Sequence, residues 1–147
     1  MRKLMIIVFL TAGLAVSLAS IAVSRAEETT PQSVESEQAA IRQVIQHYLD
    51  VTDKKDAEGI KKAFHPDTKF MSVGKNGLNQ MSLDEWWGRI SRIPGKVERT
   101  SQVTVLEVSG LAAVVKVDFG RSKDYLSLLK INGEWKIVNK VLSTSLN

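Results

Sequence analysis

Three helices are predicted from the spacing of apolar residues and from capping signals. Between positions 33 and about 53, apolar residues recur at the three-and-four spacing of one helix face: Ile41, Val44, Ile45 and Tyr48. Asp56 is a good N-cap for a shorter helix over 57–64, and the turn His-Pro-Asp at 65–67 ends it, because the residue before a proline is disfavoured in a helix. A capping box at 82–85 starts a third helix, whose inward residues are predicted to be Leu83, Trp86, Trp87 and Ile90.

The second half of the chain has the pattern of strands. Residues 102–108 and 111–120 are joined by Ser-Gly, and residues 124–131 and 134–142 are joined by Asn132-Gly133, the strongest signal for a two-residue hairpin. Short strands at 68–73 and 78–81 flank the turn at 74–77. Helices that come first and strands that follow indicate an α+β domain, with three N-terminal helices and an antiparallel sheet.

The Asn-Gly turn also predicts which residues face one another in the closing hairpin. A two-residue loop places Leu126 opposite Asn139 and Asp124 opposite Val141, so that Asp124 and Asn139 share the apolar face. A carboxylate and an amide are costly to bury without partners. Two interpretations remain open: the two side chains are solvated or hydrogen-bonded at the end of the sheet, or they line a cavity.

The other face of the predicted sheet carries its own apolar residues. If 109–110 is also a two-residue loop, the residues that project there are Val103, Val105, Val114, Leu129 and Val138, interrupted by Lys116, Lys136 and Lys140. An apolar patch on the outer face of a sheet usually marks an interface. An interface on this outer face is therefore expected.

The first residues predict export. Arg2 and Lys3 precede an uncharged run at 4–23, and Ser-Arg-Ala at 24–26 fits a signal peptide cleaved after Ala26. The alternative is an uncleaved membrane anchor. We expect a signal peptide at 1–26, a flexible lead-in at 27–35 and one domain at 36–147, with the mature protein in the periplasm or secreted.

Charge and composition exclude several classes of function. The chain has 20 basic and 16 acidic residues, and the leader holds three of the basic ones, so 17 remain against 16. No basic patch is left that would favour a nucleic acid as partner. The chain has no cysteine, which excludes disulfides, thiolate catalysis and thiolate metal sites. Two histidines on separate elements are weak ground for a metal site, and no metal or cofactor is predicted.

Several stretches resemble a known superfamily. YLD at 48–50, DAE at 56–58 and AFHPD at 63–67 resemble the opening of nuclear transport factor 2-like proteins, which include SnoaL-like proteins and ketosteroid isomerases. DYL at 124–126 and LKINGEWKIVNK at 129–140 resemble the closing hairpin of the bacterial putative lumazine-binding branch. The resemblance covers about 36–146 and implies a cone-shaped fold, in which a curved antiparallel sheet wraps around the first helix and leaves a pocket at the open end. Dimers through the sheet are common in the superfamily, so a homodimer through the outer face is expected.

The resemblance also supplies catalytic candidates to weigh. Tyr48 falls where the isomerases place a tyrosine that stabilises an oxyanion, but Met71 stands at about the position of their general base, which argues against isomerase activity. His65 could act as a base with Asp67, as histidines do in the fold's cyclases and dehydratases. The alternative for His65 is a place in a helix-ending turn.

We expect a pocket that binds an unknown small organic molecule without catalysis. Its predicted lining residues are Tyr48, Trp86, Phe119, Asp124 and Asn139, with His65 and Trp87 as weaker candidates. One alternative is a cofactor-free lyase, isomerase or hydrolase that uses Asp124 or His65 as base and Tyr48 as donor. The other is a protein-interaction module with a vestigial pocket.

Overall fold

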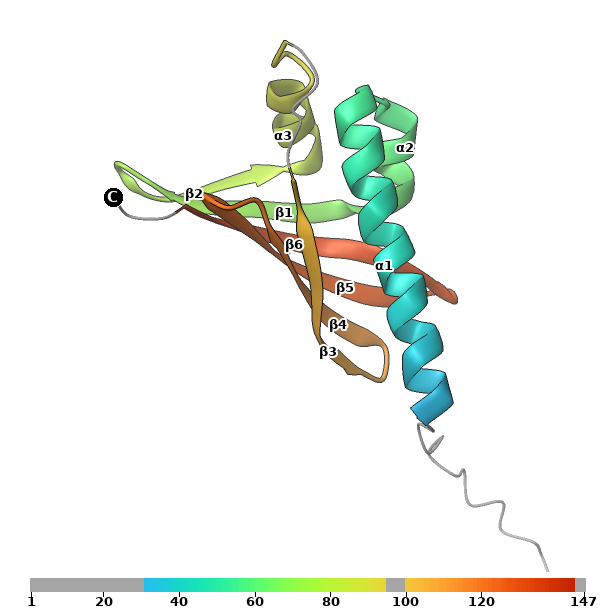
Figure 1. Ribbon diagram of the computed structural model, residues 1–147. Helices are drawn as coiled ribbons and strands as arrows, with labels where there is room; N and C mark the ends of the chain where they lie inside the picture. Colours follow the sequence, from blue (N-terminus) through green and yellow to red (C-terminus); the bar gives the residue numbers. More distant parts are fainter. Residues whose placement is uncertain (1–30, 95–99, 145–147) are drawn as a thin grey trace, which may run out of the picture.

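Three helices pack on a curved, unclosed sheet in the computed structural model of the chain, which describes residues 31–94 and 100–144 (Figure 1). The elements in chain order are α1 (Pro31–Lys54), α2 (Ala57–Ala63), β1 (Phe64–Gly74), β2 (Gly77–Ser82), α3 (Leu83–Ile90), β3 (Gln102–Ser109), β4 (Ala112–Asp118), β5 (Ser122–Ile131) and β6 (Glu134–Thr144). The predicted α+β class and the order of elements are confirmed.

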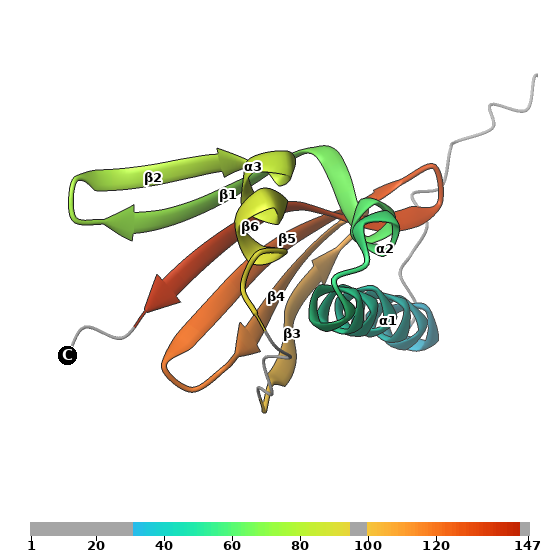
Figure 2. The same cartoon turned by 90° about the horizontal axis from the view of Figure 1, so that it is seen from above.

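The six strands form a single sheet in the order β2-β1-β6-β5-β4-β3. Strands β3 to β6 make the predicted meander, and each pair in it is antiparallel. The pair β1–β6 is parallel, which makes the sheet mixed, and β2, α3 and the first three strands of the meander lie between these two strands in the chain. Seen from above, α1 lies beside α2 over one part of the sheet and α3 lies over another (Figure 2).

Helix α1 begins at Pro31, so residues 31–35, which were predicted to belong to a flexible lead-in, are helical. Proline suits a first helical position, since its missing N–H would have no partner there. The predicted buried stripe is confirmed for Ile41, Ile45 and Tyr48, and it continues to Val51. The predicted leader lies outside the described residues. Within 31–94 and 100–144, no helix has the length and apolar character needed to cross a membrane.

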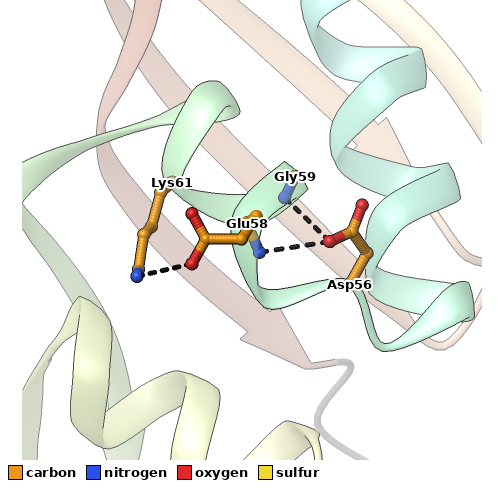
Figure 3. Close-up of polar contacts among 4 residues, drawn as sticks. All are labelled: Asp56, Glu58, Gly59 and Lys61. Carbon is orange, nitrogen blue, oxygen red and sulfur yellow. Dashed lines mark hydrogen bonds and ion pairs between the residues drawn. The ribbon is translucent and has the colours of Figure 1, made fainter.

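The turn from α1 to α2 brings these helices close together. Asp56 is the N-cap, as predicted, and its carboxylate accepts from the backbone N–H groups of Glu58 (3.1 Å) and Gly59 (3.0 Å) (Figure 3). A Cβ on Gly59 would lie 2.4 Å from Val51 Cγ1. The absence of a side chain at position 59 therefore sets how closely α2 approaches α1.

The segment 65–67 ends the helix as predicted, but it lies within strand β1 and not in a turn. The β1–β6 register is irregular between Phe64 and Lys69, where Pro66 has no N–H to give. The buried Thr68 hydroxyl lies 2.6 Å from His65 O and 2.8 Å from Ile137 O, and it replaces part of the missing ladder there.

The predicted register of the closing hairpin is wrong beyond Ile137. Leu128 faces Ile137 as expected, but Ser127 faces Asn139, because Val138 is an extra residue in β6. One extra residue moves every following side chain to the opposite face of a sheet. Asn139 therefore lies on the outer face, and Lys140, which was predicted to lie there, points into the core beside Leu126.

The β3–β4 register differs for a similar reason. The loop is 110–111, since Ser109 pairs with Ala112, and the register shifts again between Val105 and Glu107. Val105 faces Val115 and Val103 faces Val117, whose side chains are fully buried. Val103 and Val105 therefore pack against the core, and the prediction that they lie on the outer face is wrong.

Candidate functional site

Three polar side chains meet inside the core, each from a different element. Lys140 Nζ on β6 lies 2.6 Å from Asp124 Oδ2 on β5 and 2.7 Å from the phenol oxygen of Tyr48 on α1. Tyr48 Oη in turn donates to Asp124 Oδ2 at 3.1 Å. All three residues are buried, with exposed fractions of 3% for Tyr48, 2% for Asp124 and 8% for Lys140. We call them the polar triad.

The charges of the polar triad follow from burial and from its close contacts. Burial and, to a smaller extent, the carboxylate of Asp124 raise the pKa of Tyr48 to about 12, against the opposing effect of the Lys140 charge. Burial by itself would lower the pKa of Lys140, but Tyr48 and Asp124 outweigh it and the net direction is upward. At neutral pH Lys140 is therefore an ammonium and Tyr48 a neutral phenol.

A cavity of about 180 Å³ lies on one side of the triad, between the end of α1, α3 and the sheet. Tyr48 and Lys140 belong to its wall, and Trp86, Ile90 and Phe119 supply apolar surface. Its remaining lining residues are Gln46, Leu49, Asp50, Thr52, Asp53, Lys55, Ile93 and Ser101.

A second cavity, of about 260 Å³, lies on the other side of the triad, next to β1 and the ends of β5 and β6. Asp124 and Lys140 belong to its wall, with Trp86 and Ile90 again present. Its other lining residues are Phe70, Met71, Ser72, Met81, Ser122, Leu142 and Thr144. Lys140, Trp86 and Ile90 are thus common to both cavities.

Trp86 has its position fixed by neighbouring aromatic rings. Its indole stacks on Phe70 with centroids 4.5 Å apart and planes 7° apart. Lys140 Nζ lies 5.2 Å from the Trp86 ring and 5.2 Å from the Tyr48 ring, within the range of cation–π attraction. The predicted capping box of α3 is confirmed, since Ser82 and Glu85 exchange hydrogen bonds and fix where the helix that carries Trp86 begins.

The structure brings four of the five main candidate residues to these cavities. Tyr48 and Phe119 line the first, Asp124 lines the second, and Trp86 lines both. Asn139 lines neither and lies on the outer face, where its Oδ1 is buried without a hydrogen-bond partner among the described residues. The structure does not bring Asn139 and Asp124 together.

The weaker candidates lie elsewhere. His65 is at the start of β1, where its Nδ1 accepts from the backbone N–H of Asp67 at 3.2 Å. Trp87 is half-buried beside Trp86, with ring centroids 6.2 Å apart. Neither residue lines the two cavities beside the triad.

Lys140 is the functional residue that the sequence analysis placed on the wrong face of the sheet. The available signal was a lysine in a strand of apolar residues, close to an Asp on the neighbouring strand that had no partner on its face. Because a lysine is almost never fully buried unless it is paired, that Asp was a reason to test a shifted register. Within the described residues, no group of three or more His, Cys, Asp or Glu side chains is placed to hold a metal ion.

Comparison with known proteins agrees with this architecture. Residues 36–143 match the sequence profile of a family described as putative lumazine-binding. The aldolase FrzH of Cladobotryum sp. is 22% identical over 112 residues, which cover 72% of this chain and 90% of that protein.

Solved structures show the same fold. A nuclear transport factor 2-like protein of unknown function from Shewanella baltica aligns with a TM-score of 0.64 at 21% identity, over 77% of this chain and 97% of that one. A putative scytalone dehydratase from Novosphingobium aromaticivorans aligns with a TM-score of 0.65 at 16% identity, over 80% and 89%. The predicted cone-like architecture is confirmed.

Proposed function

The chain belongs to the putative lumazine-binding family of nuclear transport factor 2-like proteins, and on this basis we propose that it binds a small organic molecule in the cavities beside Lys140. The observation that carries the proposal is that two cavities, which share apolar surface from Trp86 and Ile90, converge on one fixed polar cluster. Ligand sites typically combine aromatic walls with a few well-placed polar groups. The empty volume supports binding over a vestigial pocket that its own side chains would fill.

The state of the polar triad favours binding without catalysis. Tyr48 is a weak acid near neutral pH, because its pKa is about 12. Lys140 remains an ammonium and lacks the lone pair that a nucleophilic amine needs. Asp124 already accepts from both neighbours, so that removing a proton from a substrate would break the ion pair. Met71, at the position expected for an isomerase base, lines the second cavity without a group that accepts a proton.

A cofactor-free enzyme is the second candidate, and the buried ammonium favours it. A preorganised positive charge in a dry site can stabilise an oxyanion that develops on a bound carbonyl compound. The distant relative named as an aldolase supports this candidate. Turnover of carbonyl compounds by the wild-type protein, lost on Lys140→Met, would favour it over binding alone.

We further propose that residues 1–26 are a signal peptide and that the mature protein acts in the periplasm or after secretion. The basic start, the uncharged run and Ser-Arg-Ala at 24–26 support this proposal. The intact mass of the protein recovered from the periplasm tests it. A mass that starts at Glu27 is expected, and full-length protein in the membrane fraction would contradict it.

Native mass spectrometry of protein purified from its own periplasm tests the binding proposal. The expected result is a small molecule retained under gentle conditions and lost on denaturation. Ile90→Trp, which fills space common to both cavities, should remove the bound molecule. Leu111→Trp, at a position 66% exposed in the β3–β4 loop, should retain it. Wild-type protein with nothing bound would contradict the proposal and favour an interaction module.

A further inference from the structure

The number of hydrogen-bond donors on Lys140 exceeds the number of partners that the protein gives it. An ammonium has three N–H donors and no acceptor. Its hydrogen-bonding partners among the described residues are Tyr48 Oη and Asp124 Oδ2, at 2.7 and 2.6 Å. The Lys140 side chain is 10% exposed and belongs to the wall of both cavities. One donor therefore remains for an acceptor that enters from a cavity.

The net charge around that donor decides what kind of acceptor suits it. Asp124 already compensates the ammonium, so that the buried pair is neutral as a unit. A ligand with a full negative charge would leave that charge uncompensated in a buried place, which is costly. An uncharged oxygen, as in a ketone or an amide, accepts the remaining N–H without this penalty.

The outer part of the first cavity also disfavours anions. Asp50 and Asp53 belong to its lining and face the same space as Lys55. The Lys55 ammonium donates to the carbonyl oxygen of Ile90 at 3.0 Å, which holds it toward α3. A carboxylate that enters the cavity would pass two carboxylates and one engaged ammonium.

We infer that the ligand is a neutral ring compound that presents a carbonyl oxygen to Lys140 Nζ and lies against Tyr48, Trp86 and Phe119. This inference rests on the proposed function and adds to it the chemical class of the ligand. Tyr48 and Asp124 serve as positioning residues, since they hold the ammonium at the junction of the two cavities. The phenol hydroxyl donates to Asp124, so that Lys140 is the donor left for the ligand.

Three probes of matched shape test the inference: 2-acetylnaphthalene, 2-naphthoate and 2-ethylnaphthalene, titrated at neutral pH by ligand-observed NMR. The ketone is expected to bind at least about tenfold more tightly than either of the others, a preference of about 1.4 kcal/mol. Tightest binding of the carboxylate would overturn the inference, and so would equal binding of the ketone and the hydrocarbon. Either result would still agree with the proposed function, because the cavities would bind a small organic molecule. No binding by these probes or by acetophenone, benzoate and ethylbenzene would count against both.

The double variant Lys140→Met/Asp124→Asn tests the assigned donor. The variant lacks both charges of the ion pair, and the amide oxygen at position 124 can still accept from the Tyr48 hydroxyl. Circular dichroism checks that the variant folds. The preference for the ketone over the hydrocarbon should disappear. Lys136→Met is the matched control, because Lys136 on the same strand contacts Lys62 O and Glu134 instead. A preference that survives in the double variant would overturn the assignment.

A vibrational measurement on the wild-type protein tests the same contact without a substitution. The carbonyl stretch of bound 2-acetylnaphthalene should move to lower wavenumber than in an apolar solvent, as expected for a hydrogen bond to an ammonium. An unshifted band would overturn the inference.

Discussion

Lys140 Nζ lies 2.6 Å from Asp124 Oδ2 in the core, with the two side chains 10% and 3% exposed. The contact is diagonal across two neighbouring strands, because Lys140 pairs with Leu126 and Asp124 pairs with Leu142. Taking two charges out of water is costly, and their mutual attraction compensates only in good geometry. The pair therefore contributes little net stability as a unit, yet each member depends strongly on the other.

Removing one member of this pair should be costly. Lys140→Met leaves the Asp124 carboxylate buried without its cation, and we expect it to lower the free energy of unfolding by about 3–5 kcal/mol. Urea denaturation followed by circular dichroism measures the change. Adding Asp124→Asn should recover most of the loss, because the remaining group is uncharged. Lys61→Met is the control, since Lys61 and Glu58 form an exposed pair on α2, and no measurable change is expected (Figure 3). A double variant as unstable as the single one would contradict this account.

The polar triad also shows where sequence reasoning stops. Trp86 and Tyr48 could be predicted, because a capping box and a helical stripe are local signals and fix which face is buried. The inward direction of Lys140 could not be predicted from its own strand, because it depends on one extra residue at Val138, and the pattern of apolar and polar residues in β6 does not indicate that residue. The same kind of shift near Leu106 turned Val103 and Val105 inward. The register of a sheet with bulges is set by packing against the helices. The alternation of apolar and polar residues within one strand carries no information about that packing.

Alkaline pH should destabilise the protein through Tyr48. In the unfolded chain the phenol loses its proton near its ordinary pKa of 10.0, whereas in the folded protein Tyr48 keeps it until about pH 12. The folded state therefore binds more protons in this window, and the free energy of unfolding falls as pH rises, by an amount on the order of 2 kcal/mol. The raised pKa of Lys140 acts in the same direction.

The variant Tyr48→Phe isolates the phenol's part of this effect. Urea unfolding from about pH 8 to about pH 12 should show a shallower decline in the variant than in the wild type. Tyr125→Phe is the control, since that ring is 38% exposed and does not belong to the triad. An equal slope in the wild type and in Tyr48→Phe would contradict the prediction.

Two helical glycines, one crowded and one with open space around it, predict opposite effects of substitution by alanine. A Cβ at position 59 would lie 2.4 Å from Val51 Cγ1, so Gly59→Ala should destabilise the protein by about 1–3 kcal/mol through overpacking. Gly88 in α3 has no atom within 4 Å of an added Cβ, and Gly88→Ala should stabilise it by up to about 1 kcal/mol through helix propensity. Thermal unfolding measures both. Combining Gly59→Ala with Val51→Ala should recover part of the loss, and a neutral Gly59→Ala would refute the steric argument.

The first half of α1 should detach from the sheet in acid. The Glu37 carboxylate accepts from Lys130 Nζ at 2.5 Å and from Trp135 Nε1 at 2.6 Å, and these two bonds lower the pKa of Glu37 below its ordinary 4.5. These two hydrogen bonds contribute fully to the free energy of unfolding above the pKa that Glu37 has in the unfolded chain. The contribution is lost as pH falls through the lower pKa that Glu37 has in the folded protein. The indole N–H signal of Trp135, assigned with Trp135→Phe, should shift with a midpoint below 4.5. Glu37→Gln should abolish the shift, and a midpoint above 4.5 would contradict the prediction.

The outer sheet face remains our proposal for a homodimer interface. Val114 and Leu129 stay in the predicted set, whereas Val103 and Val105 leave it because they face the core. Val105→Glu would place a charge on the core side and test folding, because Val105 faces the buried Val115. Leu129, 42% exposed on β5, is the suitable position, and Val114 and Tyr125 are each 38% exposed.

We expect a dimer for the wild type and a monomer for Leu129→Glu by light scattering, because a carboxylate buried in an apolar interface has no partner. Leu111→Glu should stay dimeric, since Leu111 is 66% exposed in the β3–β4 loop, before β4 begins. A monomeric wild type, or a dimer that tolerates Leu129→Glu, would exclude this face.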